Sequence, residues 1–128
     1  MDINYIIKTD KSFEEAVESL KAALTKAKFG VLYELNFKDK LKEKNLDFNR
    51  NFKVLEVCNP FQAKKVLDEF LEAGFFLPCK MVVYEENDSV FIGMPKPTML
   101  ISMVHNDKLS EIAGQVEDML RQAVNEAV

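Results

Sequence analysis

The two cysteines are the residues of this chain best suited to chemistry, and each lies at an expected junction between secondary-structure elements. Cys58 ends an expected strand directly before Asn59-Pro60, which begins a helix. The partial positive charge of a helix N-terminus favours a thiolate, as in reactive cysteines. Cys79 follows Leu77-Pro78 at the start of another expected strand, and two strand ends at one edge of a sheet could bring the thiols together. The pair is therefore a candidate redox or soft-metal site.

The alternative interpretation of both cysteines is structural, and we favour it. Cysteine is among the most buried residue types and fills small spaces in cores. A closed zinc site needs four ligands, and the chain adds one histidine, His105, which we interpret as a solvated loop residue. Two cysteines in 128 residues also give no disulfide framework. We therefore predict no metal and no cofactor.

Composition and charge restrict the class of protein. The chain has 128 residues, 48% of them hydrophobic and 30% charged, which predicts one soluble domain spanning residues 1–128. The net charge of −4 argues against nucleic acid as a partner, because phosphate binding needs a basic surface. No segment approaches the ~20 apolar residues of a membrane span. The N-terminus lacks the features of a secretory signal, so we expect a cytoplasmic protein without membrane contact.

Hydrophobic periodicity predicts an amphipathic helix near each end of the chain. Ser12 and Glu15 form a capping-box pattern, and apolar residues then recur at three- and four-residue spacing, with Gly30 as the expected stop. A second helix is expected from Asn106 or Asp107 to the C-terminus. Both helices present one apolar stripe that must pack on something else.

Shorter helices are expected between these two. Asn59 is a strong N-cap and Pro60 suits the first helical position, so a helix should run from there to Gly74. The charged segment 38–44 favours a short surface helix. Segment 98–104 fits either a strand or a short helix, and the break at the preceding proline favours the helix.

Five strands complete the expected fold, at 3–8, 31–37, 52–58, 77–86 and 89–94. Asn87-Asp88 suits a tight turn between the last two, which makes them an antiparallel hairpin. Runs of strands with helices at the ends are typical of an α+β fold. We predict an antiparallel sheet of about five strands with helices on one face.

The strand expected at 31–37 alternates with a period of two residues, as in a sheet that is covered on one side. Glu34 then lies on the uncovered face, either as a binding residue or as part of a solvent-facing or dimer-facing surface. We expect that face to mix polar and apolar side chains: Leu32, Glu34, Asn36, Lys80, Val82 and Tyr84.

Short phrases over nearly the whole chain carry a family resemblance. They are Phe29-Gly30-Val31 with Glu34, Leu55-Glu56-Val57-Cys58-Asn59-Pro60 with Ala63, Leu77-Pro78-Cys79 leading into Val82-Val83-Tyr84-Glu85, and Pro97 with the final helix. With these phrases the chain resembles the domain-of-unknown-function family numbered 302. The resemblance implies a strand–helix–four strands–helix domain, similar to half of the TATA-binding-protein saddle and often homodimeric. It implies no activity, ligand or catalytic residue. Lys80 departs from the family, which often has Arg there, and this substitution removes bidentate anion binding.

The residues thus leave the function unknown, and they provide no recognisable catalytic set. We favour a small cytoplasmic homodimer, leaning away from an enzyme, that binds a small ligand or a partner protein through its open sheet face. The alternative is a thiol-dependent redox or metal-handling protein that uses Cys58 and Cys79. The candidate site residues are Cys58, Cys79, Asn59 and Glu34.

Overall fold

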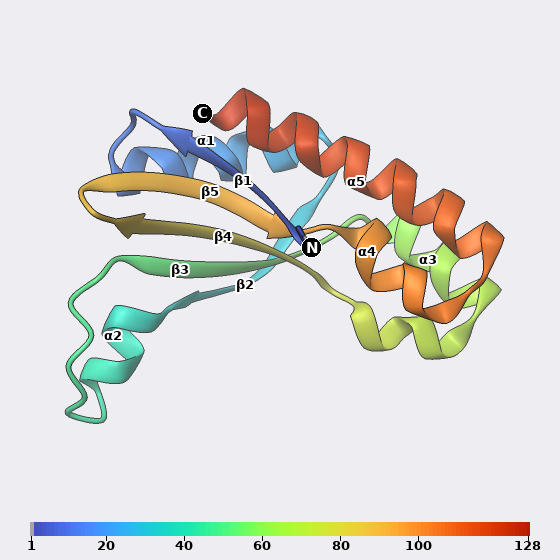
Figure 1. Cartoon of the computed structure of the whole chain (residues 1–128), viewed down its shortest axis with the longest axis horizontal. Coiled ribbons are helices and arrows are strands. Elements are labelled where there is room, and N and C mark those ends of the chain that lie inside the picture. Colours follow the sequence, from blue (N-terminus) through green and yellow to red (C-terminus); the bar gives the residue numbers. More distant parts are fainter. Residues whose placement is uncertain (1) are drawn as a thin grey trace.

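The computed structural model describes residues 2–128 and has a five-stranded sheet with helices against one face and beyond both ends (Figure 1). Its elements are β1 (Asn4–Thr9), α1 (Phe13–Lys26), β2 (Gly30–Asn36), α2 (Phe37–Lys42), β3 (Phe52–Cys58), α3 (Pro60–Glu69), the 3₁₀ helix η1 (Leu71–Phe76), β4 (Cys79–Glu86), β5 (Ser89–Pro95), α4 (Pro97–Ile101), the 3₁₀ helix η2 (Ser102–Val104) and α5 (Asp107–Ala127). The strand order is β1-β5-β4-β3-β2, with every neighbouring pair antiparallel. The predicted α+β fold is confirmed.

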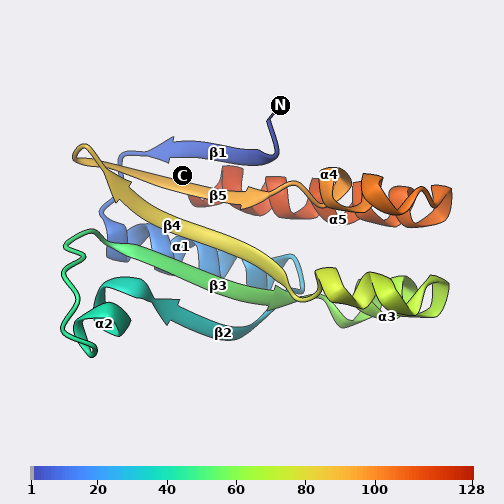
Figure 2. The ribbon, with the colours of Figure 1, turned by 60° about the horizontal axis from the view of Figure 1, so that its bottom comes forward.

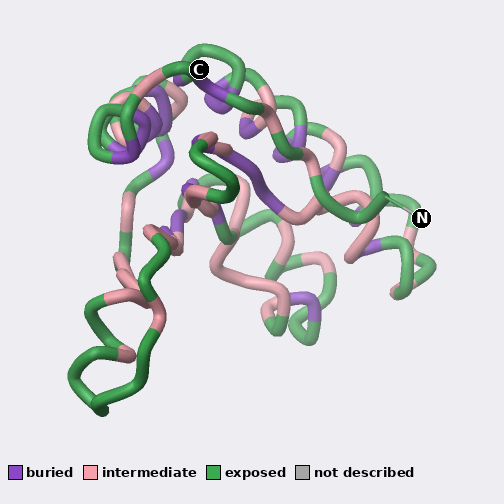
Figure 3. The backbone as a smooth tube through the Cα atoms, turned by 60° about the vertical axis from the view of Figure 1, so that its left-hand side comes forward, coloured by how far each residue is buried: buried purple, intermediate pink, exposed green. Residues whose placement is uncertain are grey.

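The main core lies between the sheet and the two long helices, α1 and α5 (Figures 1 and 2). Their apolar stripes supply the buried side chains of the helix layer, and alternate residues of β3, β4 and β5 supply those of the sheet. Figure 3, in which buried residues are purple, shows them concentrated where the sheet and these helices face each other. Among residues 2–128, no helix is long and apolar enough to cross a membrane. The largest fully buried side chains are Leu20, Leu24, Leu55, Met81, Ile92, Leu109 and Leu120.

Helix α1 begins as predicted but ends differently. Ser12 and Glu15 form the complete capping box. At the other end, Lys28 takes the left-handed conformation, with φ 68°, and Phe29 donates its backbone N–H to Leu24. This is a Schellman ending, in which the buried Phe29 packs back on the helix. The prediction that Gly30 stops α1 was wrong, because Gly30 already begins β2.

Helix α3 is shorter than predicted. Phe70 has extended backbone angles and breaks the helix before η1. Gly74, the predicted stop, lies inside η1, where a Cβ would come within 2.8 Å of Leu67 Cδ2. Because this atom is the end of a flexible, exposed side chain, a small shift of Leu67 would accommodate a larger residue at position 74. Segment 98–104 is helical, as favoured, although it begins at Pro97.

A β-bulge in β2 overturns the expected position of Glu34. Val31 pairs with Val57 but Tyr33 pairs with Glu56, so one extra residue shifts the alternation. Glu34 consequently lies on the helix side, 2.9 Å from Lys21 Nζ.

Asn36 shifts with it, and its side chain caps α2 by accepting from Asp39 N. The prediction that Glu34 and Asn36 occupy the open face was wrong. Lys80, Val82 and Tyr84 do lie there, on the side of β4 opposite the buried Met81 and Val83.

The ion pairs of Glu34 predict a pH-dependent contribution to stability. Hydrogen bonds from Lys21 and then Lys53 hold the pKa of Glu34 below its usual value of 4.5. A carboxylate whose pKa is lowered in the folded state contributes fully to stability above its usual, unfolded-state pKa. This contribution is lost as the pH falls through the folded-state pKa. We expect Glu34→Gln to lower the unfolding free energy at pH 7 by less than about 1 kcal/mol, because the pair is partly exposed.

Urea unfolding of both proteins between pH 7 and pH 2 checks this prediction. The difference between wild type and Glu34→Gln should shrink towards zero as the pH falls below 4.5. A difference that persists unchanged at the acid end would contradict an electrostatic origin.

Candidate ligand-binding cavity

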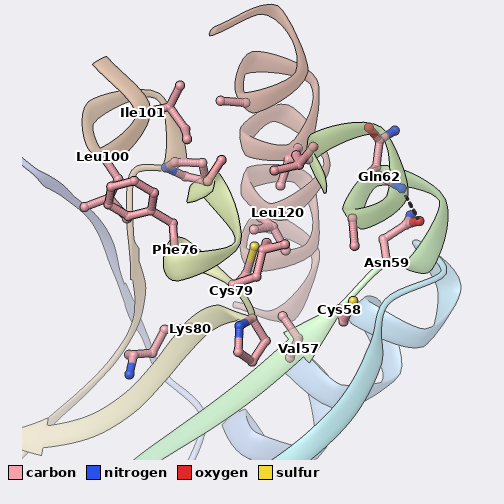
Figure 4. Close-up of a pocket in the computed structure, with 18 of the residues that line it drawn as sticks. Val57, Cys58, Asn59, Gln62, Phe76, Cys79, Lys80, Leu100, Ile101 and Leu120 are labelled. Carbon is pink, nitrogen blue, oxygen red and sulfur yellow. Dashed lines mark hydrogen bonds between the residues drawn. The ribbon is translucent and has the colours of Figure 1, made fainter. Parts of the chain in front are cut away.

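An apolar cavity of about 130 Å³ lies beyond the ends of β3 and β4 (Figure 4). Its walls come from α3 and η1 on one side and from α4 and α5 on the other. Most of the lining is aliphatic, aromatic or proline. The lining includes Val57, Val66, Ala73, Phe76, Pro78, Pro97, Leu100, Ile101, Ala113 and Leu120, together with Cys58, Asn59, Gln62, Cys79 and Lys80.

The cavity arises because two helical segments extend past the sheet. The chain leaves β3 at Cys58, forms α3 and η1, and returns into β4 through the cis Leu77-Pro78 bond. It leaves β5 into α4 and then runs back over the sheet as α5. The two segments meet in a small second core of four residues: Ala73, Ile101, Leu109 and Ala113.

Asn59 holds the first turn of α3 in place. Its side chain is buried, and Oδ1 accepts from the backbone N–H groups of Phe61, at 3.0 Å, and Gln62, at 3.3 Å. Pro60 occupies the first helical position, where no hydrogen bond is lost. The prediction of Asn59 as an N-cap is confirmed. Its side-chain oxygen is therefore occupied by backbone N–H groups of α3 rather than presented to the cavity.

Gln62 behaves differently from a capping-box residue. It stands where a capping box places Glu or Gln, but it makes no bond to the backbone of Asn59. Its Oε1 atom is buried and has no hydrogen-bond partner among residues 2–128. Gln62 lies at one end of the cavity in Figure 4.

Both cysteines line the cavity, as thiols rather than as a disulfide. Burial raises the pKa of the Cys79 thiol to about 11, with a smaller contribution from nearby Cys58. At neutral pH Cys79 is thus protonated and behaves as part of the apolar wall. The strand register pairs Cys79 with Val57 instead of Cys58. Within residues 2–128, no group of three or more His, Cys, Asp or Glu side chains is placed to hold a metal ion.

The structure brings three of the four candidate site residues together. Cys58, Asn59 and Cys79 line the one cavity, whereas Glu34 does not. His105 also lies outside it, in a left-handed conformation at the end of η2. The wall formed by η1, α4 and α5 could not be assigned from local sequence, because these segments meet only through tertiary packing.

A second candidate surface is the open sheet face, on the side of the sheet opposite α1 and α5 (Figure 1). Here the rings of Phe37, Phe52, Tyr84 and Phe91 form a continuous row, with successive centroids 5.7, 5.7 and 5.3 Å apart. Such spacing gives favourable aromatic contacts. We use "open face" for this row together with its neighbours on the same side: Tyr33, Leu35, Val54, Glu56, Lys80 and Val82.

The N-cap geometry predicts the effect of two substitutions at Asn59. Asn59→Ala leaves two backbone N–H groups without their acceptor and should lower the unfolding free energy by about 1 kcal/mol. Asn59→Ser keeps an acceptor and should stay close to wild type. Chemical denaturation measures both. An alanine effect well under half the expected value, or equal effects of the two substitutions, would show that capping is not the role of this side chain.

Comparison with known proteins identifies the family. The model of the family described as "Domain of unknown function DUF302" matches residues 5–127. The crystal structure of an uncharacterized conserved DUF302 protein from Bacillus stearothermophilus is similar over 100% of both chains, with 42% identity and a TM-score of 0.97. No curated protein matches the chain significantly. The chain belongs to the DUF302 family, whose function is unknown.

Proposed function

We propose that this protein is a non-enzymatic binding module that holds a small ligand in the cavity beyond β3 and β4. One observation carries the proposal: three candidate residues predicted from sequence converge on a single apolar cavity. Ligand sites are concave, mostly apolar and equipped with few polar groups. The cavity replaces the open face as the ligand site.

The groups around the cavity favour binding over chemistry. Asn59 is engaged by the backbone of α3, and the raised pKa of Cys79 leaves little thiolate at neutral pH. Nucleophilic thiol chemistry requires the thiolate. These features also count against the alternative of a thiol-dependent redox protein, because one of its two thiols would rarely be reactive.

Filling the cavity tests the proposed site. Ala63 lies on α3 and lines the cavity, so Ala63→Leu should occupy part of it. We expect toluene, a small apolar probe, to raise the thermal midpoint of the wild type. A ligand at ten times its dissociation constant adds about 1.4 kcal/mol to the unfolding free energy. The toluene effect should disappear in Ala63→Leu.

The matched control is Ala22→Leu, which adds the same atoms at an exposed position of α1. It should retain the full response to toluene. Toluene binding that survives in Ala63→Leu, or a wild type that responds to neither toluene nor phenol, would refute the cavity as a ligand site. If the leucine side chain is too large for the cavity and Ala63→Leu does not fold, Ala63→Val is the alternative variant, because its smaller side chain fills less of the cavity.

We further propose that the open face is covered by a second copy of the chain in a two-fold homodimer. A continuous aromatic row beside Val54 and Val82 is unusual on a surface exposed to water. Glu56 and Lys80 are cross-strand neighbours on this face. A two-fold axis that passes through the face beside this pair would bring Glu56 of each copy towards Lys80 of the other, so that the face would complement itself. An interface of roughly 1,200–2,000 Å² in total is expected.

A charge at the centre of the open face should separate the two copies. We expect the wild type to sediment at twice its 14.7 kDa chain mass and Val82→Lys to sediment as a monomer. Met103→Lys, at an exposed apolar residue of η2 outside this face, is the control and should remain dimeric. A wild type that is monomeric up to high micromolar concentration would exclude this homodimer.

We also propose that the 128 residues act as a single domain and that the protein works in the cytoplasm. Its two cysteines are unpaired, and reducing compartments keep thiols in that state. The acidic balance, with a net charge of −4, supports partners other than nucleic acid.

A further inference from the structure

One residue of the cavity wall carries a polar atom that no contact within residues 2–128 accounts for. Oε1 of Gln62 is buried without a hydrogen-bond partner, whereas Oδ1 of nearby Asn59 accepts two backbone N–H groups. Buried carbonyl groups in folded proteins are nearly always paired, because an unpaired acceptor is costly. Gln62 lines the cavity, so a rotation of its terminal amide, a soft torsion, would bring this oxygen to a donor on a bound ligand.

A water molecule fits this position poorly. Buried waters need two to four polar partners, and the cavity offers few besides Gln62. The Asn59 oxygen is already engaged, and a protonated Cys79 thiol is only a weak hydrogen-bonding group. The remaining lining is predominantly apolar. A ligand with one hydrogen-bond donor on an otherwise apolar body would match both the Gln62 oxygen and the apolar lining.

The volume of the cavity limits the size of that body. About 130 Å³ is close to the ~150 Å³ of apolar cavities that bind benzene. A single six-membered ring or an equally small aliphatic group matches this space.

The electrostatics of the cavity disfavour a charged ligand. Lys80 is an exposed residue, so the only ionised side chain among the lining residues remains in contact with water. Burying an unpaired ionic group is far more costly than burying a hydroxyl that finds a partner. The protonated Cys79 offers no ready covalent attachment, which favours reversible binding.

We propose that the cavity binds a small uncharged molecule, about one six-membered ring in size, whose single O–H or N–H group donates to Oε1 of Gln62. This proposal rests on the proposed function, since it specifies the ligand of the same cavity. Gln62 acts here as the residue that determines ligand specificity.

Three probes of similar size test the ligand class by isothermal titration calorimetry with the full chain. Phenol carries a donor, toluene has no polar group, and anisole has only an acceptor. The variant Gln62→Met keeps the length of the side chain and removes the acceptor. The ratio of phenol affinity to toluene affinity should fall at least about fivefold from wild type to Gln62→Met.

Gln122→Met is the matched control, at an exposed position of α5 away from the cavity, and should preserve the wild-type ratio. An equal ratio in wild type and Gln62→Met would overturn the proposed ligand class while toluene binding still supported the cavity as a site. A dependence on Gln62 for anisole instead of phenol would likewise overturn it, because the ligand would then be an acceptor. If none of the probes binds the wild type, both proposals fail. Circular dichroism verifies folding, and Gln62→Leu replaces the methionine variant if that variant is unfolded.

Discussion

The length of α5 determines much of the rest of the structure. At 1.5 Å per residue its 21 residues span about 32 Å, whereas the eight residues of β4, the longest strand, span about 26 Å. The N-terminal part of α5 therefore extends past the sheet, as Figures 1 and 2 show, and carries part of its apolar stripe with it. Leu109 and Ala113 in this part are buried by α4 and the α3–η1 segment instead of by strands. The cavity lies where helix-on-sheet packing gives way to helix-on-helix packing.

A buried carboxylate connects α4 to this overhanging part of α5. Glu117 accepts from the backbone N–H and the hydroxyl of Thr98 and pairs with Arg121. Burial acts to raise the pKa of Glu117, but the hydrogen bonds from Thr98 and Arg121 outweigh it and hold the pKa below its usual value. The carboxylate is thus stabilised in its ionised form. It supports the α4 wall of the cavity through charge-assisted hydrogen bonds, which are stronger than neutral ones.

Local chemistry made a large part of this fold predictable. Ser12, Asn59 and Asn106 each cap a helix as their type and position suggest. Asn87 and Asp88 adopt the positive φ values that a tight hairpin requires. Features decided by tertiary packing were not predictable. The bulge that moved Glu34 leaves no trace in a period-two pattern, and Phe70 carries no strong helix-breaking signal. Cys58, Asn59 and Cys79 could be singled out, but the cavity that unites them depends on η1, α4 and α5.

The cavity also leaves out packing contacts that would otherwise stabilise this fold. Large-to-small core substitutions cost about 24 cal/mol per Å³ of residual cavity, so a fully enclosed void of 130 Å³ corresponds to about 3 kcal/mol of missing packing. This cavity is partly open, which makes the figure an upper bound. Small domains have a total stability of about 5–15 kcal/mol, so even part of that amount is substantial. A single larger side chain at Ala63 or Ala73 could occupy much of the space. On the proposal made above, a ligand bearing a donor would supply both the missing packing and the missing partner of the Gln62 oxygen, and its binding would return stability to the fold.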